Sequence, residues 1–506
     1  MKYNNPATYW GAIETRAAAT PDAPLTIEPD GTVMTFGGFR AAAERAAAGL
    51  AAMGVAADTR VSWQLPNGRA SLILSAALAR LGAVQNPIIP IYREREVGFV
   101  VRQTGARLLV VPSVWRGFDY QAMAESVAAT TDDCQVLVCD GQLPEGDPAD
   151  LAPFESPAGH DGRPPVRWIY YTSGTTADPK GAMHGDDGVI AAARHVWENL
   201  ELRADDVWPL AFPFTHIGGI SLLIATLVCG TPMLMVESFN PTEDTRFFRE
   251  HGLTLAGSGT PFFIAFLAEQ RKTPGQPIFP EMRAAIGGGA PKPAGLHLEV
   301  KEEMGGVGII SSYGLTECPI VTYCRLDDPD DKLATTEGRI ISDTDWKLID
   351  GELLLKGPTL CRGYLDEALN ETAFDDEGFF FTGDLAEVDD EGFVTIVGRK
   401  KDVIIRKGEN ISAKEVEDVL FAHPKVADVA VIGLADPTSG ERCCAVVAPK
   451  AGQGFGFGEM VEHCREVGLM NQKIPEQLEI VDELPRNPAG KVLKQQLRET
   501  YQQSEH

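Results

Sequence analysis

The stretch that decides the fold is Tyr171-Thr-Ser-Gly-Thr-Thr-Ala-Asp-Pro-Lys180-Gly181, which follows the apolar run Trp168 to Tyr171. A short apolar run that ends in turn residues predicts a buried strand. The turn after it carries four hydroxyl side chains and a glycine, and Lys180 adds a positive charge. Clustered amides and hydroxyls beside a cation suit the oxygens of a phosphate group. The stretch therefore predicts a phosphate-binding loop at the end of a sheet strand.

This loop is not a Walker A motif, because the ending Gly-Lys-Ser/Thr is absent. The plainer interpretation of such a segment is a Ser/Thr-rich surface turn. The strand before it and the sequence Pro179-Lys180-Gly181 after it make phosphate binding the better interpretation.

Strands and helices alternate along the N-terminal part of the chain. An Ala-rich helix has Gly54 as its expected C-cap, and a second helix is expected to end near Gly82. Short apolar runs between and after them predict strands. The predicted ranges are helices at 40–53 and 71–80 and strands at 61–65, 107–112 and 135–139. This alternation predicts an α/β fold with mostly parallel sheets.

The pattern of residue types along the chain changes from Asp350 onward. Short strands separated by Asp and Gly turns predict a β-rich subdomain, with strands at 351–356, 385–388 and 393–397. Beyond Arg399, a helix at 414–421 and strands at 426–432 and 443–448 predict a compact α+β unit. A chain of 506 residues is too long for one ordinary core. We therefore predict a large, multi-subdomain N-terminal domain, residues 1–398, and a small C-terminal domain, residues 399–506.

The composition is that of a globular protein, with 44% apolar and 23% charged residues. Lysine and arginine number 45 and the acidic residues number 72, so the formal net charge is 45 − 72 = −27. Such a charge repels phosphate backbones and argues against nucleic acid as a partner. A small anionic ligand would need positively charged residues at its binding site to offset the negative electrostatic field of the whole protein.

The remaining features indicate a cytoplasmic protein. Nine cysteines without a CxxC pair indicate reduced thiols, not a disulfide framework or a zinc site. The first six residues contain Asn-Asn-Pro and no apolar core, so no signal peptide is expected. The uncharged run 217–236 is long enough for a membrane helix, but Gly230-Thr231-Pro232 divides it. We predict a buried helix, a turn and a strand there, and no integral membrane span.

Residues 171–181 resemble the phosphate-binding signature of the adenylate-forming superfamily, which comprises acyl-CoA synthetases, nonribosomal adenylation domains and luciferases. That signature usually has Gly where this chain has Ala177, a change that stiffens the loop without removing a charge or a hydroxyl. Further matches follow in the order of the family and cover most of the chain. They are Ile286-Gly-Gly-Gly-Ala-Pro291, Ser312-Tyr-Gly-Leu-Thr-Glu317, residues 351–357 with Arg362-Gly-Tyr364, Phe381-Thr-Gly-Asp384, Gly398-Arg-Lys-Lys-Asp402, Arg406-Lys-Gly-Glu-Asn-Ile411 and Leu484-Pro-Arg-Asn-Pro-Ala-Gly-Lys491.

The resemblance implies a site for ATP and Mg²⁺. Tyr313 would stack on adenine, Thr316 would touch the α-phosphate, and Glu317 would hold Mg²⁺, a cation that binds carboxylate and phosphate oxygens together. Asp384 would accept hydrogen bonds from both ribose hydroxyls, and Arg399 would contact ribose or phosphate. The nucleotide-binding residues that the resemblance implies are Thr172, Ser173, Gly174, Thr175, Thr176, Lys180, Gly288, Gly289, Ala290, Pro291, Tyr313, Gly314, Asp384 and Arg399.

The resemblance also implies two half-reactions in one cleft. Lys491 would carry adenylation. Lys401 falls at the hinge position between the large and small domains. Rotation about it would replace Lys491 with the hairpin Lys407, Gly408 and Glu409, which would bind coenzyme A in the second step. The family often has Gly where this chain has Lys407.

The acid is expected to bind beside Phe212-Pro-Phe-Thr-His216-Ile-Gly-Gly219, which resembles the family's aromatic/His motif next to the substrate carboxylate. A lone histidine in an apolar stretch is more often a core residue, but the motif favours a catalytic role for His216. Adenylation domains for amino acids commonly carry an Asp just after the corresponding aromatic residue, whereas residues 211–235 contain no Asp or Glu. This favours an acid without an α-amine. The expected pocket residues are His216, Ile217, Ile220, Gly257, Ser258 and Thr260.

Together these features predict an ATP-dependent carboxylic acid–CoA ligase that acts through an acyl-adenylate on an apolar aliphatic, alicyclic or aromatic acid. Two alternatives stay open: an acyl-AMP ligase that loads a carrier protein, and a non-catalytic nucleotide-binding homologue. The expected partners are a small carboxylic acid and coenzyme A. A monomer and a homodimer both remain possible.

Overall fold

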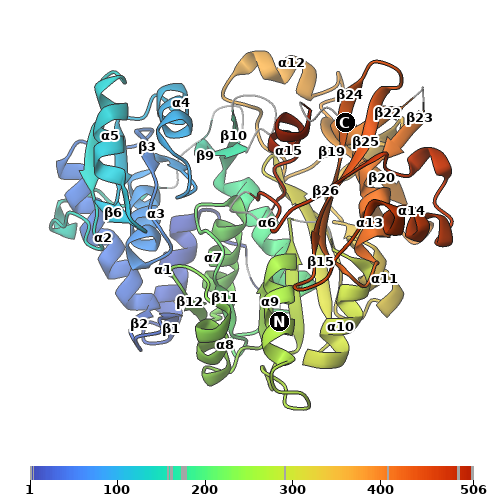
Figure 1. Ribbon diagram of the computed structural model, residues 1–506. Helices are drawn as coiled ribbons and strands as arrows, with labels where there is room; N and C mark the ends of the chain where they lie inside the picture. Colours follow the sequence, from blue (N-terminus) through green and yellow to red (C-terminus); the bar gives the residue numbers. More distant parts are fainter. Residues whose placement is uncertain are drawn as a thin grey trace.

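The structure, a computed structural model, describes residue 3 and residues 5–155, 159, 163–172, 179–289, 292–406, 409–486 and 491–502. It has the α/β fold that the sequence predicts, with a large N-terminal domain and a small C-terminal domain of about residues 410–500. In Figure 1 the N-terminal elements, blue to cyan, lie at the left, and the orange to red C-terminal elements lie at the right. The exact junction, placed between Gly398 and Arg399, stays a prediction.

A six-stranded sheet in the large domain carries the segment that the sequence predicts to bind phosphate. Its strands pair in parallel except at the edge, where β9 and β10 form an antiparallel pair. The order across the sheet is β10 (Lys180–Gly185), β9 (Val166–Thr172), β4 (Val84–Pro87), β3 (Arg60–Trp63), β5 (Leu108–Val111) and β8 (Gln135–Val138). The strands predicted at 61–65, 107–112, 135–139 and 168–171 are therefore confirmed, with small shifts of their ends.

Two further sheets complete the body of the large domain. Each is parallel over part of its width and antiparallel at an edge. One has the order β11 (Trp208–Leu210), β12 (Met233–Met235), β1 (Pro24–Ile27) and β2 (Val33–Thr35). The other has the order β13 (Leu255–Ser258), β14 (Ala284–Gly288), β15 (Ile309–Leu315), β16 (Cys318–Tyr323) and β17 (Arg339–Ile340). A separate small hairpin pairs β6 (Val114–Trp115) with β7 (Phe118–Asp119).

The predicted β-rich subdomain is an antiparallel four-stranded sheet of β18 (Asp345–Ile349), β19 (Glu352–Lys356), β20 (Phe380–Val388) and β21 (Val394–Arg399). The sheet that follows it has the order β23 (Glu409–Ser412), β22 (Val403–Arg406), β25 (Gly440–Pro449) and β24 (Val426–Asp436), with β26 (Gln477–Ile480) parallel to β25. The Ser412 hydroxyl donates to the Val397 carbonyl at 2.7 Å, so β23 is tied to β21 of the preceding sheet.

Helices cover the faces of these sheets. In the large domain they are α1 (Tyr9–Ala19), α2 (Phe36–Ala52), α3 (Arg69–Leu81), α4 (Glu94–Thr104), α5 (Tyr120–Ala129), α6 (Asp186–Asn199), α7 (Ile217–Cys229), α8 (Pro241–Glu250), α9 (Thr260–Gln270), α10 (Ala294–Met304), α11 (Asp330–Thr335) and α12 (Asn370–Ala373). In the C-terminal part they are α13 (Ala413–Phe421), α14 (Phe457–Glu466) and α15 (Lys494–Tyr501).

The helix boundaries follow local capping chemistry. Helix α3 ends at Gly82, whose φ is +68°, as the sequence predicts. Helix α2 begins at Phe36, before the predicted Arg40. The reason is Thr35, whose side chain accepts a hydrogen bond from the Gly38 amide at 3.0 Å and so caps the first turn.

The uncharged run 217–236 forms helix α7, a turn and strand β12, which confirms the prediction. Gly230 ends the helix with a φ of +79°. Within the part of the chain that the structure describes, no helix is both long enough and apolar enough to span a bilayer.

The two domains have separate apolar cores. The core of the large domain contains five tryptophans, Trp10, Trp63, Trp168, Trp197 and Trp208, each at most 3% exposed. The C-terminal domain packs residues such as Ile404, Val431 and Met460 into clusters of its own. A domain with its own core can move as a unit, which a hinge between the two requires.

Asp186 connects three elements inside the large domain. Its Oδ2 accepts a hydrogen bond from the Tyr9 amide at 2.9 Å, and its Oδ1 accepts one from Trp168 Nε1 at 3.0 Å. Asp186 itself begins helix α6, so its carboxyl joins that helix to α1 and β9. Burial raises the pKa of this carboxyl. Its removal would leave two buried donors without an acceptor.

The substitution Asp186→Ala is expected to lower the free energy of unfolding by about 3 kcal/mol, because each orphaned buried donor costs about 1–3 kcal/mol. Urea unfolding monitored by tryptophan fluorescence measures the loss. The control is Asp187→Ala, which removes a 45% exposed carboxylate that pairs with Arg362 and should cost less than about 1 kcal/mol. Equal losses in the two variants would contradict the role of Asp186.

Candidate active site

The segment predicted to bind phosphate connects β9 to β10, the antiparallel pair at one edge of the six-stranded sheet. Thr172 at the end of β9 pairs with Lys180 at the start of β10, so both ends of the loop are held together. Four predicted phosphate-binding residues, Ser173, Gly174, Thr175 and Thr176, lie outside the described residues. The Lys180 ammonium lies 5.2 Å from the centroid of the Tyr364 ring.

Glu317 follows Thr316 in the turn between β15 and β16. Its side chain is buried, and its Oε1 accepts a hydrogen bond from the Tyr364 hydroxyl at 2.5 Å. The Thr316 carbonyl accepts a hydrogen bond from His184 Nε2 at 2.9 Å. Burial lowers the pKa of His184 to about 4, so this ring is neutral and its Nε2 carries the proton. The turn that presents Glu317 is thus held from two sides.

Tyr313, Asp384 and Arg399 form a second polar group, which strands β15, β20 and β21 bring together. The Tyr313 hydroxyl donates to Asp384 Oδ2 at 2.6 Å, and Arg399 Nε lies 2.7 Å from Asp384 Oδ1. Asp384 and Arg399 are also direct partners across β20 and β21. Burial, together with the Asp384 charge, raises the pKa of Tyr313, which therefore stays protonated and donates. Each carboxylate oxygen keeps a further lone pair for a ribose hydroxyl.

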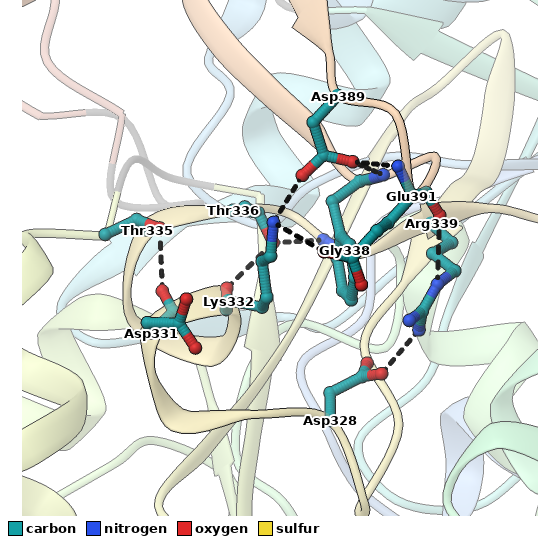
Figure 2. A network of polar contacts seen from close by, with 10 residues as sticks. Asp328, Asp331, Lys332, Thr335, Thr336, Gly338, Arg339, Asp389 and Glu391 are labelled. Carbon is teal, nitrogen blue, oxygen red and sulfur yellow. Dashed lines mark hydrogen bonds and ion pairs between the residues drawn. The ribbon is translucent and has the colours of Figure 1, made fainter.

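The far end of the β20–β21 hairpin is fixed by another network (Figure 2). Lys332 Nζ lies 2.6 Å from Asp389 Oδ2, and the Arg339 guanidinium lies 3.8 Å from the centroid of the Phe393 ring. Arg339 also pairs with Asp328. These contacts attach the hairpin to the segment around α11. Asp384 and Arg399 are therefore carried by a hairpin that is held at both ends.

Close backbone packing explains two of the predicted glycines. A Cβ on Gly288 would lie 2.4 Å from the Ser312 carbonyl oxygen, and one on Gly314 would lie 2.0 Å from the Pro319 carbonyl oxygen. Larger residues there would push apart the strands that hold Tyr313. Gly289 follows β14 with a φ of +77°, and Ala290 and Pro291 lie outside the described residues.

His216 is the N-cap of helix α7. Its Nδ1 accepts a hydrogen bond from the Gly218 amide at 3.1 Å, so the proton of the neutral ring is on Nε2. Burial, with a further contribution from the Lys491 charge, lowers the pKa of His216 to about 4. His216 can therefore donate a hydrogen bond from Nε2 to a carboxylate near neutral pH.

Asn67 holds the loop that precedes His216. Its Nδ2 donates to the carbonyls of Phe212 and Val236 at 2.9 and 3.2 Å, and its Oδ1 accepts from the Phe214 amide at 2.7 Å. Sequence reasoning missed Asn67 because its partners lie far along the chain.

A cavity of about 20 Å³ lies beside His216, and its walls are mostly apolar or aromatic. Among the described residues, it is lined by Pro87, Ile88, Ile89, Tyr92, Val100, Tyr170, Tyr171, Thr215, His216, Ile217 and Thr316. Two of the predicted pocket residues, His216 and Ile217, belong to this wall. Ile220 is fully buried in the core of the large domain, and Gly257 lies buried in β13. The pocket roles of Ile220, Gly257, Ser258 and Thr260 stay predictions.

Lys491 belongs to the C-terminal part of the chain, yet it lies among the charges of the large domain. Burial and then the Arg399 charge lower the pKa of Lys491, whereas Asp384 and Glu317 act in the opposite direction. Lys401, in the short helix Lys400–Asp402, also has a lowered pKa, because of burial and then of Arg399. The structure therefore brings Lys491 to the site that Glu317 and Asp384 define.

The predicted coenzyme A hairpin is only partly described. Lys407 and Gly408 lie outside the described residues, and Glu409 begins strand β23. Sequence reasoning also missed the part that Tyr364 plays. Its motif with Arg362 pointed to a structural role, but nothing local indicated that its hydroxyl reaches Glu317.

Comparison with known proteins identifies the family to which the chain belongs. Residues 13–365 match the AMP-binding enzyme family, and residues 415–491 match the AMP-binding enzyme C-terminal domain. Because the first match covers more than half of the chain, the chain belongs to the AMP-binding enzyme family, within the adenylate-forming superfamily. The resemblance drawn from the motifs is confirmed, and the protein is an adenylate-forming ligase.

Individual relatives differ in the reaction that their names state. The chain is 28% identical over 528 residues to the medium-chain fatty-acid–CoA ligase of Escherichia coli, covering 97% of this chain and 89% of the relative. It is 29% identical over 524 residues to the vibriobactin-specific 2,3-dihydroxybenzoate-AMP ligase of Vibrio cholerae, covering 97% and 93%. The structure of O-succinylbenzoate coenzyme A synthetase from Bacillus subtilis, in complex with ATP and magnesium ion, matches with a TM-score of 0.82 and 26% identity over 96% of this chain and 99% of that chain.

The proximity of Lys491 to His216 can be tested directly. The substitution Lys491→Gln removes a nearby positive charge, so the pKa of His216 is expected to rise above its value of about 4 in the unaltered protein. Nitrogen-detected NMR titration of the histidine rings, with His216 assigned through His216→Gln, measures this change. An identical His216 titration in the two proteins would show that the domains do not bring the two residues together in solution.

Proposed function

We propose that the protein is an ATP-dependent carboxylic acid–CoA ligase that works through an acyl-adenylate intermediate. The observation that carries this proposal is the position of Lys491. A residue of the C-terminal part lies within the electrostatic reach of Glu317, Asp384, Arg399 and His216. A lysine of the C-terminal part thus lies near groups that are suited to ribose, phosphate and carboxylate. The family membership supports the class of reaction.

In the first step, an oxygen of the substrate carboxylate attacks the α-phosphorus of ATP. The bond from that phosphorus to the bridging oxygen breaks, and pyrophosphate leaves with the electron pair. Two anions approach each other, so the step needs cations and oriented donors at the developing charge. Lys491 and Lys180 supply positive charge, and Nε2 of His216 can donate to the carboxylate. Asp384 would orient the ribose.

The residues present fit Mg²⁺. This cation usually takes one or two carboxylates together with phosphate oxygens and water. Glu317 offers one buried carboxylate, and among the described residues no group of three His, Cys, Asp or Glu side chains could hold a metal without the nucleotide. Glu317 would hold Mg²⁺, whose positive charge would offset the negative charge of the triphosphate oxygens.

In the second step, the thiol sulfur of coenzyme A attacks the carbonyl carbon of the adenylate. The thiol loses its proton, the bond from that carbon to the phosphate oxygen breaks, and AMP leaves. We propose that rotation about Lys401 withdraws Lys491 and brings in the hairpin of Lys407, Gly408 and Glu409. The separate core of the C-terminal domain supports movement as a unit.

The substrate is proposed to be an apolar acid. Residues 211–235 contain no acidic side chain, and the cavity beside His216 has none among its described lining residues. The α-ammonium of an amino acid would therefore be buried without a partner, which costs several kcal/mol. An apolar tail would instead gain free energy by leaving water.

A ligase that transfers the acyl group to a carrier protein is the second candidate, because the name of the Vibrio cholerae relative states an AMP ligase and does not mention coenzyme A. It would share the first half-reaction. Acid-dependent pyrophosphate release across a panel of carboxylic acids tests the adenylation step, and product analysis with free coenzyme A separates the two acceptors. Pyrophosphate release with any acid would also eliminate a non-catalytic homologue.

We expect single substitutions to impair one half-reaction and spare the other. Lys491→Ala should reduce acyl-adenylate formation by a factor of about 10² or more, the range seen when one preorganised charge-stabilising donor is removed. It should still convert supplied acyl-adenylate to the thioester. Rapid-quench measurement of each half-reaction checks this, and equal losses in both would overturn the division of roles.

The matched variant for this test is Lys401→Pro. Proline fixes φ and should hinder rotation about the proposed hinge. Adenylation should survive in this variant while thioester formation is lost, the reverse of the Lys491→Ala pattern. Persistence of both half-reactions would place the hinge elsewhere.

Activity is expected to rise with each methylene added to the acid, until the pocket is full. Each buried CH₂ contributes roughly 0.8 kcal/mol, and overpacking beyond that length should lower the rate. The measurement is kcat/KM for straight-chain, cyclohexyl and aryl acids, with phenylalanine as the charged counterpart of 3-phenylpropanoate. Better activation of phenylalanine than of 3-phenylpropanoate would contradict an apolar-acid site.

A further inference from the structure

The segment of residues 361–365 runs beside strand β10 and also reaches the Glu317 turn. It therefore contacts, through its backbone, both the strand that begins with Lys180 and the turn that presents Glu317. The hydrogen bonds run from Arg362 N to Met183 O (2.8 Å), Met183 N to Gly363 O (3.0 Å), Leu365 N to Gly181 O (2.8 Å) and Cys361 N to Glu317 O (2.7 Å). The relative position of Lys180 and Glu317 is thus set by one short piece of chain.

Tyr364 lies in the middle of this segment, and its side chain contacts both residues. The hydroxyl donates to Glu317 Oε1 at 2.5 Å, and the ring centroid lies 5.2 Å from the Lys180 ammonium. The residue is 3% exposed. Asn370 fixes its backbone, because Asn370 Oδ1 accepts from the Tyr364 amide at 2.8 Å and Asn370 Nδ2 donates to the Tyr364 carbonyl at 3.2 Å.

In the hydrogen bond between Tyr364 and Glu317, the tyrosine is the donor and the carboxylate is the acceptor. Burial, together with the Glu317 charge, raises the pKa of Tyr364, so the hydroxyl is protonated and acts as the donor. A bond to Oε1 restrains the Glu317 rotamer and leaves Oε2 for a metal ion. The face of the ring carries partial negative charge and attracts the Lys180 ammonium. One side chain therefore orients a carboxylate with one end and a cation with its face.

We propose that Tyr364 is a positioning residue for metal-bound ATP: its hydroxyl orients Glu317 toward the cation, while its ring holds Lys180 toward the phosphates. The proposal rests on the proposed function, in which Glu317 binds Mg²⁺ and Lys180 binds phosphate. Because the two contacts use different parts of the side chain, they can be removed one at a time.

The test is ATP binding without acid, measured by isothermal titration calorimetry at a series of Mg²⁺ concentrations. Tyr364→Phe keeps the ring and removes the hydroxyl. It should raise the Mg²⁺ concentration for half-maximal enhancement of ATP binding about tenfold or more, the effect of losing one hydrogen bond to a charged group. ATP binding in the absence of Mg²⁺ should stay unchanged.

Tyr364→Leu removes the ring as well. It should show the same shift in Mg²⁺ dependence and, in addition, about two- to fivefold weaker ATP binding without Mg²⁺, because Lys180 loses its aromatic partner. If Tyr364 only supported the fold, the two variants would not differ in ATP binding without Mg²⁺ while sharing one shift in Mg²⁺ dependence. The control is Tyr120→Phe, which removes a buried hydroxyl that donates to the Pro90 carbonyl at the same distance of 2.5 Å and should change neither quantity.

Equal Mg²⁺ dependence in Tyr364→Phe and the unaltered protein would overturn the role of Tyr364, as would an equal shift in Tyr120→Phe. ATP binding that is insensitive to Mg²⁺ in the unaltered protein would overturn it too. Acid-dependent pyrophosphate release is measured separately on the unaltered protein. If Mg²⁺-dependent ATP binding follows the expected pattern but no acid gives pyrophosphate, the positioning role stands and the proposed function fails.

Discussion

The ion pair between Asp384 and Arg399 is the interaction on which the rest of the site depends. It joins adjacent strands of one hairpin, and the Tyr313 hydroxyl connects the same carboxylate to another sheet. Arg399 is also the last residue of β21, only a short helix away from the first strand of the C-terminal sheet. The contact that would orient the ribose therefore also fixes the point from which the C-terminal domain departs, and with it the position of Lys491.

Cations gather at this point in a chain whose formal net charge is −27. Burial and the Arg399 charge lower the pKa of both Lys491 and Lys401, so these groups are held together against their mutual repulsion. A polyphosphate relieves that repulsion. Its binding should therefore favour the arrangement in which the two domains meet, since a ligand shifts an equilibrium by its differential affinity for the two states. Release of pyrophosphate would remove part of that attraction and so favour the rotation about Lys401 that we propose.

The features that could be predicted from sequence are those set by neighbouring residues. The break of the apolar run at Gly230 follows from local rules, and the motifs around Lys180 and Glu317 follow from a fixed order of residue types. Contacts between distant residues could not be found in this way. The hydrogen bond from Tyr364 to Glu317 joins residues 47 positions apart, and His184 reaches the Thr316 carbonyl only because β10 lies beside that turn.

In the proposed function, the nucleotide side and the acid side of the site differ in how strictly they constrain the sequence. Ribose and phosphate would be bound through hydrogen bonds, whose distance and angle requirements restrict the residue types at positions such as Asp384 and Arg399. An apolar tail is bound by burial of area, which has no preferred direction and which many combinations of side chains can supply. In the proposed function, substitutions at Ile217, which lines the cavity beside His216, would therefore change the preferred acid while the polar groups of the nucleotide side keep their geometry. The structure places the two sets of residues on different elements, because Ile217 of the cavity wall begins helix α7, whereas Asp384 and Arg399 lie on the β20–β21 hairpin.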